Sequence, residues 1–201
     1  MHDLIIATTN QGKFREIREV LAGQFSSFYS LSDLENGYTV VEDQQSYAEN
    51  AWKKARKIGN RFGIDTLADD SGLEVDALNG RPGIYSSRYG KSDAERIDRL
   101  LAELDRVEEQ SRGAIFKAYL AFYIPAEGRG YFFYGSIRGR IGRERKGRGG
   151  FGFDPVFYIP ELGKHMAELT IEEKNRISHR GRALTAFSNF SKRVLQAPSN
   201  H

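Results

Sequence analysis

Residues 4–21 read LIIATTNQGKFREIREVL, a stretch that predicts a strand, a turn and a helix in succession. Leu4 to Ala7 form a short apolar run, which is typical of a buried strand. A polar turn with a glycine follows, and Phe14, Ile17 and Leu21 then recur at the spacing of one helix face. A unit of this kind favours an α/β fold.

The same alternation continues along the chain. Three pairs of residues at capping-box spacing mark further helix starts, namely Ser46 with Glu49, Ser92 with Glu95, and Thr170 with Glu173. A β-branched strand is expected just before Glu42, and a last helix over about 182–195. The apolar runs 114–124 and 131–137 flank Pro125, Gly128 and Gly130, as two strands of a hairpin do. This antiparallel pair predicts a mixed sheet.

Composition limits the class of protein. The chain has 201 residues, a net charge of +3 and 39% hydrophobic residues, which predicts one domain over residues 1–201. The absence of cysteine excludes disulfides and thiolate sites, so any metal is expected on carboxylate oxygens. No apolar run is long enough for a membrane span or a secretory signal, and a cytoplasmic location is therefore expected.

The turn after the first strand is a candidate phosphate-binding loop. It consists of Thr8, Thr9, Asn10, Gln11, Gly12 and Lys13. Free backbone N–H groups at a helix N-terminus, hydroxyls and an ammonium suit an anion such as phosphate. The alternative is that Thr and Asn only cap the helix while Lys13 is solvated.

Acidic residues form a second candidate segment. Asp69 and Asp70 are expected where a short apolar strand ends, and Ser71 follows in the loop. Neighbouring side chains of an extended segment point to opposite sides, so the two carboxylates are expected to do different work. One of them can bind magnesium or activate water, with Glu42 as a further acid, while the other orients backbone or a second ligand; Asp-Ser-Gly is also an ordinary turn signal.

Two more segments carry polar residues that a fold alone does not require. The first, GGFGFDP at 149–155, follows a basic tract at 138–148; Phe151 or Phe153 can stack on a base. An ordered loop with solvated arginines competes there with an RNA-binding arm. The second segment, 173–182, holds Lys174 on a helix and then His179 and Arg180 at a predicted break over 178–181, where they can donate to a base or phosphate. Its alternative is a helix–helix connection with exposed charge.

Five blocks together resemble the inosine triphosphate pyrophosphatase family, also called Ham1-like proteins. In chain order they are ATTNQGKFREI, SYAENAWKKA, ADDSGLEVDALNGRPGIYSSRY, GGFGFDPVF and AELTIEEKNRISHRGRAL. The resemblance covers essentially the whole chain. Thr9 and Gln44 stand where many members have glycine, which puts fine specificity and the role of Glu42 in question.

The resemblance implies a magnesium-dependent hydrolysis of non-standard purine nucleoside triphosphates (ITP, dITP, XTP) to the monophosphate and pyrophosphate. It also implies an elongated mixed sheet flanked by helices, two lobes with the active-site cleft between them, a homodimer, and neither a nucleic-acid nor a membrane partner.

Residue roles follow from the same resemblance. Thr8 to Lys13 would hold the triphosphate, Ser71 a phosphate, and Asp70 both the attacking water and Mg²⁺, with Glu42 as second ligand. Catalysis is assigned to Asp70, Lys13 and Asp69. The nucleoside pocket would be formed by Phe151, Gly152, Phe153, Asp154 and Lys174, and the base read by His179 and Arg180. The alternatives are a Maf-like pyrophosphatase for other modified nucleotides and a non-catalytic RNA-binding protein.

Overall fold

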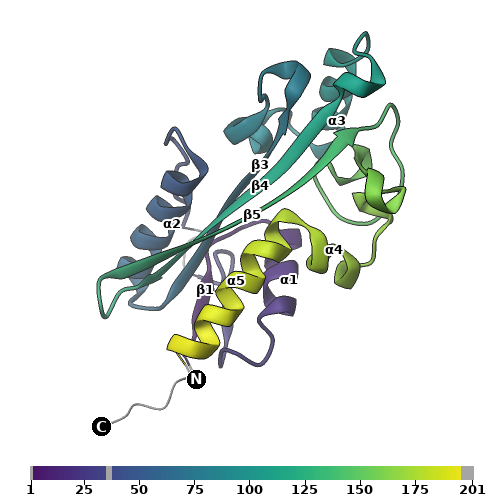
Figure 1. Cartoon of the computed structure of the whole chain (residues 1–201). Coiled ribbons are helices and arrows are strands. Elements are labelled where there is room, and N and C mark those ends of the chain that lie inside the picture. Colours follow the sequence, from purple (N-terminus) through teal and green to yellow (C-terminus); the bar gives the residue numbers. More distant parts are fainter. Residues whose placement is uncertain (1, 35–37, 196–201) are drawn as a thin grey trace. The chain divides into compact units, whose positions relative to one another are not determined.

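The computed structural model describes residues 2–34 and 38–195, within which seven strands form one mixed sheet. The strands are β1 Leu4–Ile6, β2 Phe28–Ser30, β3 Thr66–Val75, β4 Gly113–Ile124, β5 Arg129–Ile141, β6 Phe157–Ile159 and β7 Lys164–His165 (Figure 1). Their order is β2-β1-β3-β4-β5-β6-β7. β1 pairs parallel with β2 and β3, whereas β6 pairs antiparallel with β5 and β7. The predicted mixed α/β fold is confirmed.

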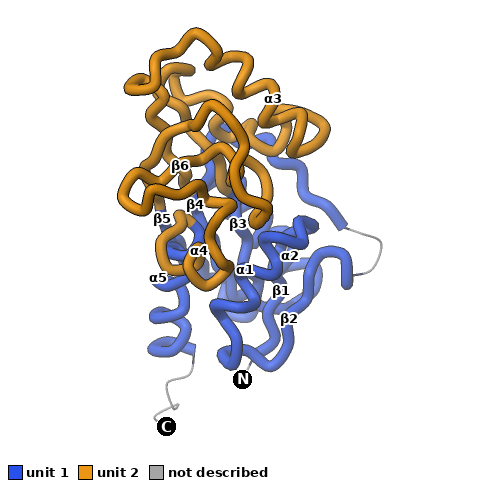
Figure 2. Tube along the Cα trace, turned by 90° about the vertical axis from the view of Figure 1, so that its right-hand side faces the viewer, with its two compact units in different colours: residues 1–70, 118–135, 180–201 blue, residues 71–117, 136–179 orange. Residues whose placement is uncertain are grey.

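The chain divides into two compact units, which Figure 2 shows in different colours. Unit 1 comprises the described parts of residues 1–70, 118–135 and 180–201, and unit 2 comprises residues 71–117 and 136–179. Each of β3, β4 and β5 contributes residues to both units.

Unit 1 has helices on both faces of its part of the sheet. The helices are α1 Gln11–Val20, α2 Tyr47–Phe62 and, from Arg180 on, α5 His179–Val194. Side chains alternate along β1, so Leu4 and Ile6 share a core with α1 and α5, while Ile5 and Ala7 share one with α2. In Figure 1, α2 accordingly lies on one side of the strands, and α1 and α5 lie on the other. This arrangement brings the start of α1, the start of α2 and the middle of β3 into one unit.

Unit 2 is built around a separate apolar core. Its helices are α3 Asp93–Glu103 and α4 Ile171–Ile177. Leu73 of β3, Leu100 of α3 and Phe157 of β6 are fully buried in this core. Short 3₁₀ turns connect the remaining elements at Asp76–Leu78, Gly83–Arg88, Glu109–Ser111, Asp154–Val156, Pro160–Leu162 and Met166–Glu168.

The helix starts agree with the capping signals. Ser46, Ser92 and Thr170 are the N-caps of α2, α3 and α4, and each hydroxyl accepts from the backbone N–H three residues on. At α4 the Glu173 carboxylate also accepts from the backbone N–H of Thr170, at 2.8 Å, which completes the capping box.

Two expectations about elements are wrong. Residues 38–43 form no strand: Tyr38 and Val40 are partly buried against the core, but Val41 is 69% exposed. The break before the last helix is Ser178 alone, in an extended conformation, and α5 begins at His179 rather than near 182. Gly181 therefore lies inside a helix. Burial of His179 and Arg180 at its start outweighs the cost of about 1 kcal/mol that glycine brings.

Among the described residues, no helix combines the length and the apolar character needed to cross a bilayer.

Candidate active site

β3 carries the two adjacent aspartates of unit 1. We expected them where a short strand ends, but the strand continues through Asp69, Asp70 and Ser71 to Val75, so that expectation is wrong. Both carboxylates find partners on neighbouring elements, and Ser-Gly therefore remains extended instead of turning. Asp69 and Asp70 are 2% and 5% exposed. As predicted, their side chains make different contacts.

Asp69 is held by two cations. Lys13 of α1 donates from Nζ to Oδ1, and Arg180 of α5 donates from Nε to Oδ2 at 3.1 Å. Burial alone would raise the pKa of Asp69, but Arg180 and Lys13 outweigh it and the pKa is lowered. Arg180 also donates from Nη1 to Glu16 at 2.6 Å, so its guanidinium lies between two carboxylates. Asp69 is consequently a fixed negative charge that positions Lys13.

The pKa of Asp70 is shifted in the opposite direction, upwards. Its Oδ2 accepts from Asn50 Nδ2 at 3.0 Å, on the first turns of α2. Burial raises the pKa of Asp70 to about 6; Lys54 lowers it in part, and Glu42 raises it further. A carboxyl group with such a pKa exchanges protons near neutral pH, which is the property of a general base.

Glu42 lies near Asp70 in unit 1. Lys54 donates from Nζ both to Glu42 Oε1 and to the backbone carbonyl of Asp69, each at 2.5 Å. Burial would raise the pKa of Glu42, but Lys54 and then Lys13 outweigh it and the pKa is lowered. The pKa of Glu42 is thus lowered, whereas that of the nearby Asp70 is raised.

The loop before α1 caps that helix through side chains, as the alternative interpretation expects, while Lys13 pairs with Asp69 and is not simply solvated. Asn10 is the N-cap and accepts from the backbone N–H of Lys13 at 3.0 Å, while Thr8 Oγ1 accepts from the backbone N–H of Asn10 at 3.1 Å. Thr8 is buried, Thr9 and Gln11 are exposed, and Gly12 is half-buried. The Lys13 ammonium has three donors, so it can contact an anion as well as Asp69.

The donor set fits a magnesium ion held by few protein ligands. Burial raises the pKa of Asp70 and the like charge of Glu42 adds to this, so a divalent cation would relieve the repulsion between the two carboxylates. Within residues 2–34 and 38–195, no group of three or more His, Asp or Glu side chains is placed to hold a metal. Magnesium commonly uses one or two carboxylates and takes its other ligands from phosphate and water.

Unit 2 holds the glycine-rich segment around one buried ion pair. Asp154 Oδ2 accepts from Lys174 Nζ at 2.5 Å and from the backbone N–H of Phe151 at 2.9 Å. Asp154 and Lys174 are 3% and 4% exposed. Gly150 has φ +72°, and a Cβ there would clash with the Asp154 carboxylate, which explains the glycine.

Aromatic side chains of this segment differ in what they offer. Phe151 is half-buried, with Lys174 Nζ 4.6 Å from its ring centroid. Phe153 is buried in the core, 6.3 Å from the ring of Tyr89, so the suggestion that it offers a stacking face is wrong. The backbone N–H of Gly152 donates to Asp93 at 2.7 Å, a partner that sequence reasoning missed.

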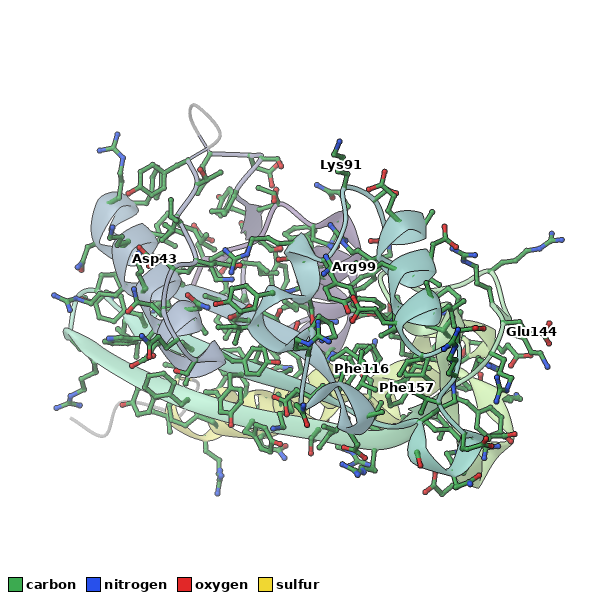
Figure 3. The ribbon with its side chains drawn as sticks, turned by 90° about the horizontal axis from the view of Figure 1, so that it is seen from above. Asp43, Lys91, Arg99, Phe116, Glu144 and Phe157 are labelled. Carbon is green, nitrogen blue, oxygen red and sulfur yellow. The ribbon has the colours of Figure 1, made fainter. Side chains whose placement is uncertain are left out.

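His179 is also buried in unit 2. Its ring stacks on Phe116, with centroids 4.7 Å apart and planes 10° apart. Figure 3 labels Phe116 and Phe157, whose rings are 4.5 Å apart in the same cluster. Ser71 is half-buried on β3. The structure therefore places Phe151, Asp154 and Lys174 together in unit 2, and Lys13, Glu42, Asp69, Asp70 and Arg180 together in unit 1.

Sequence reasoning also missed Glu16, Asn50 and Lys54. Each is a buried polar residue, between 1% and 7% exposed. Asn50 and Lys54 are four residues apart on the face of α2 that carries Ala51 and Ala55, so polar residues beside an apolar stripe were the available signal.

Comparison with known proteins gives consistent matches. Residues 4–190 match a family model described as Ham1 family. A dITP/XTP pyrophosphatase of Geobacter sulfurreducens is 46% identical over 187 residues, which are 92% of this chain and 94% of that protein. One of Geobacillus kaustophilus is 46% identical over 188 residues, or 92% of each chain.

Solved structures resemble this fold closely. A HAM1 protein from Coxiella burnetii has a TM-score of 0.85 and 37% identity, covering 96% of this chain and all of its own. A nucleoside-triphosphatase / dITP/XTP pyrophosphatase from Mycobacterium abscessus has a TM-score of 0.72 and 39% identity, covering 92% of this chain and 98% of its own.

Proposed function

Because the chain belongs to the Ham1 family, we propose that it hydrolyses non-standard purine nucleoside triphosphates (ITP, dITP and XTP) to the monophosphate and pyrophosphate. This reaction breaks the bond between the α-phosphorus and its bridging oxygen, with water as the nucleophile. The chain must therefore remove a proton from water and neutralise charge on the triphosphate.

The observation that carries the proposal is the contrast between Asp69 and Asp70. Asp70, with its pKa raised to about 6, accepts the proton of the attacking water; Asn50 orients its carboxylate. Asp69 stays ionised and keeps Lys13 in place. One aspartate thus moves a proton while its neighbour positions a cation.

Lys13 and the loop residues Thr8 to Gly12 bind the triphosphate. The ammonium and the backbone N–H groups at the start of α1 offer positive potential to the phosphate oxygens. Ser71 adds a hydroxyl contact. Glu42 and Asp70 would hold Mg²⁺, which lowers the pKa of a bound water and offsets phosphate charge when present.

Most of the residues that bind the nucleoside belong to unit 2. The half-buried ring of Phe151 stacks on the base, and the Asp154–Lys174 pair holds the Gly150–Gly152 backbone in place. His179 and Arg180 donate to the 6-keto oxygen of hypoxanthine or xanthine. Adenine presents an amino donor there, and it is rejected because two donors then face each other.

The chain is one domain of two lobes over residues 1–201, and it works in the cytoplasm, where the nucleotide pool is. It also forms a homodimer. This is supported by Phe132 and Tyr134 of β5, which are 52% and 46% exposed in unit 1 and whose rings lie next to Trp52 and Tyr119 respectively.

The test is pyrophosphate release from a panel of ITP, dITP, XTP, GTP, ATP and modified pyrimidine or methylated nucleotides, each with and without Mg²⁺. We expect Mg²⁺-dependent release that is fastest with the hypoxanthine and xanthine nucleotides. Faster turnover of the modified pyrimidine or methylated nucleotides would favour the Maf-like alternative. No release from any substrate would reject the proposal.

A further inference from the structure

The basic tract at 138–148, which has no role in the proposed function, lines part of a cavity in unit 2. The cavity has a volume of about 470 Å³. It is lined by Glu109, Arg140, Ile141, Gly142, Arg143, Glu144, Lys146, Tyr158 and His165. None of these residues belongs to the proposed phosphate-binding loop at 8–13, to the carboxylates Glu42, Asp69 and Asp70, or to the glycine-rich segment at 149–155.

His165 brings an unsatisfied ring nitrogen to this cavity. The residue is 5% exposed, and its backbone N–H and Nδ1 both face Glu168 Oε2, at 2.6 and 3.3 Å. Its Nε2 has no hydrogen-bond partner within the part of the chain that the structure describes. A Cβ on Gly142 would lie 2.7 Å from that nitrogen, so any larger residue at position 142 would displace the imidazole. A buried polar atom left in this way lowers stability unless a ligand or water pairs with it.

The charges around the cavity favour an anion. Arg140 pairs with Glu109 at 3.1 Å and Lys146 with Glu144 at 3.2 Å, but Arg143 has no carboxylate within 4 Å among the described residues. Figure 3 labels Glu144, the exposed carboxylate of the second pair. Three cations and two carboxylates therefore line the cavity, and a divalent cation would meet net repulsion.

A further cation lies behind the cavity wall. Arg112 is 1% exposed and donates to three backbone carbonyls, those of Ile141 at 2.8 Å, Gly142 at 2.9 Å and Leu104 at 2.6 Å. Its guanidinium has no carboxylate partner among the described residues. Because carbonyl dipoles compensate a buried charge only in part, an anion next to Ile141 and Gly142 would be stabilised.

We propose that this cavity is a second anion site, which binds a phosphate-class oxyanion through Arg143, Lys146 and His165 Nε2. The imidazole can bond in either protonation state, since a protonated Nε2 donates to phosphate oxygen and an unprotonated one accepts from a hydrogen phosphate. The volume accommodates orthophosphate, pyrophosphate or the phosphate of a mononucleotide. A nitrogen enclosed beside Gly142 favours such a compact ligand over a nucleic-acid strand, which would contact the exposed arginines.

The experiment follows the His165 ring by nuclear magnetic resonance of the full chain labelled with ¹⁵N-histidine. Orthophosphate, pyrophosphate, a nucleoside monophosphate and a single-stranded RNA oligonucleotide are titrated separately, and His165→Gln assigns the resonance. We expect a saturable shift of the His165 signal with at least one of the three small ligands. The three arms distinguish a free phosphate from one carried by a nucleotide.

Two matched variants locate the site. Arg143→Gln removes a cation of the cavity wall and should weaken binding about tenfold, the equivalent of one charge-assisted hydrogen bond. Arg106→Gln removes the same charge from an exposed position outside the cavity and should leave affinity unchanged. Both should keep the circular dichroism spectrum of the wild type.

The proposal is overturned if no small phosphate moves the His165 signal, or if Arg143→Gln and Arg106→Gln weaken binding equally. A shift caused by RNA alone, with a steep dependence on salt, would replace it with nucleic-acid binding. Because the readout is a resonance of His165, its result does not depend on whether the chain hydrolyses nucleotides.

Discussion

Replacing Asp70 with asparagine should stabilise the metal-free protein at neutral pH while it removes turnover. Folding raises the pKa of Asp70 from 3.8 to about 6, which means that the folded state resists ionisation of this carboxyl group. The contribution of this group to stability is therefore fully present below its unfolded pKa of 3.8 and is lost as the pH rises through about 6. The shift of about 2.2 units, at 1.36 kcal/mol each, corresponds to at most about 3 kcal/mol at pH 7.

An asparagine side chain at this position would carry no such charge at any pH. We therefore expect the free energy of unfolding of Asp70→Asn to exceed that of wild type by about 3 kcal/mol at pH 7. This difference corresponds to a rise of roughly 6–12 °C in melting temperature. The two proteins should have equal stability below about pH 3.8. Turnover should fall on the order of a hundredfold or more, because the general base is lost.

The assay is urea unfolding in EDTA across pH 3 to 8, followed by circular dichroism, with pyrophosphate release measured in parallel with Mg²⁺. The matched control is Asp69→Asn, at the adjacent residue of β3. The pKa of Asp69 is lowered, so its contribution is present above the unfolded pKa of 3.8 and lost as the pH falls through the folded pKa. That variant should be destabilised at pH 7, by about 3–5 kcal/mol for an opened buried ion pair. If Asp70→Asn is no more stable than wild type at pH 7, the conclusion that folding raises the pKa of Asp70 is wrong.

The remaining predictions concern substrate binding, base choice and assembly. Lys13→Ala should raise KM and lower kcat for ITP together, because the ammonium serves both ground and transition states; an unchanged kcat/KM at fixed ionic strength rejects the role. Arg180→Lys should slow every nucleotide through the loss of Asp69 positioning and reduce the ITP to ATP ratio of kcat/KM about tenfold. An unchanged ratio would leave Arg180 without a part in base reading. Tyr134→Glu should convert the proposed dimer to a monomer in light scattering with the melting profile preserved; if wild type is itself monomeric, the dimer proposal fails.

The sequence predicted local structure well where one residue determines it. The N-caps Ser46, Ser92 and Thr170 satisfy the first backbone N–H groups of their helices by themselves, so neighbouring letters are enough to locate them. Asp69-Asp70-Ser71 is the opposite case. These residues usually leave a strand, yet here Lys13, Arg180 and Asn50 keep them in one, and those partners lie far away in the chain.

In the candidate site, too, some features follow from local sequence and others depend on residues far apart in the chain. The residue types that we propose to contact phosphate or metal are conspicuous in the sequence, and the segments that carry them could be chosen from it. The partners that tune them, such as Glu16 beside Arg180 and Lys54 beside Glu42, look like ordinary helix residues until the fold brings them together. Burial also decides between Phe151 and Phe153, which the sequence cannot distinguish.

The loop that carries Glu42 is attached to α2 through side chains. Lys54 holds Glu42, Lys53 holds Asp43, and Asn50 accepts from the backbone N–H of Gln44 at 3.0 Å. Binding of a cation by Glu42 would therefore be thermodynamically linked to ordering of this loop, since each state favours the other. Amide hydrogen exchange should reveal the link as slower exchange in residues 42–46 when Mg²⁺ and nucleotide are added together, with the interior of α2 unaffected.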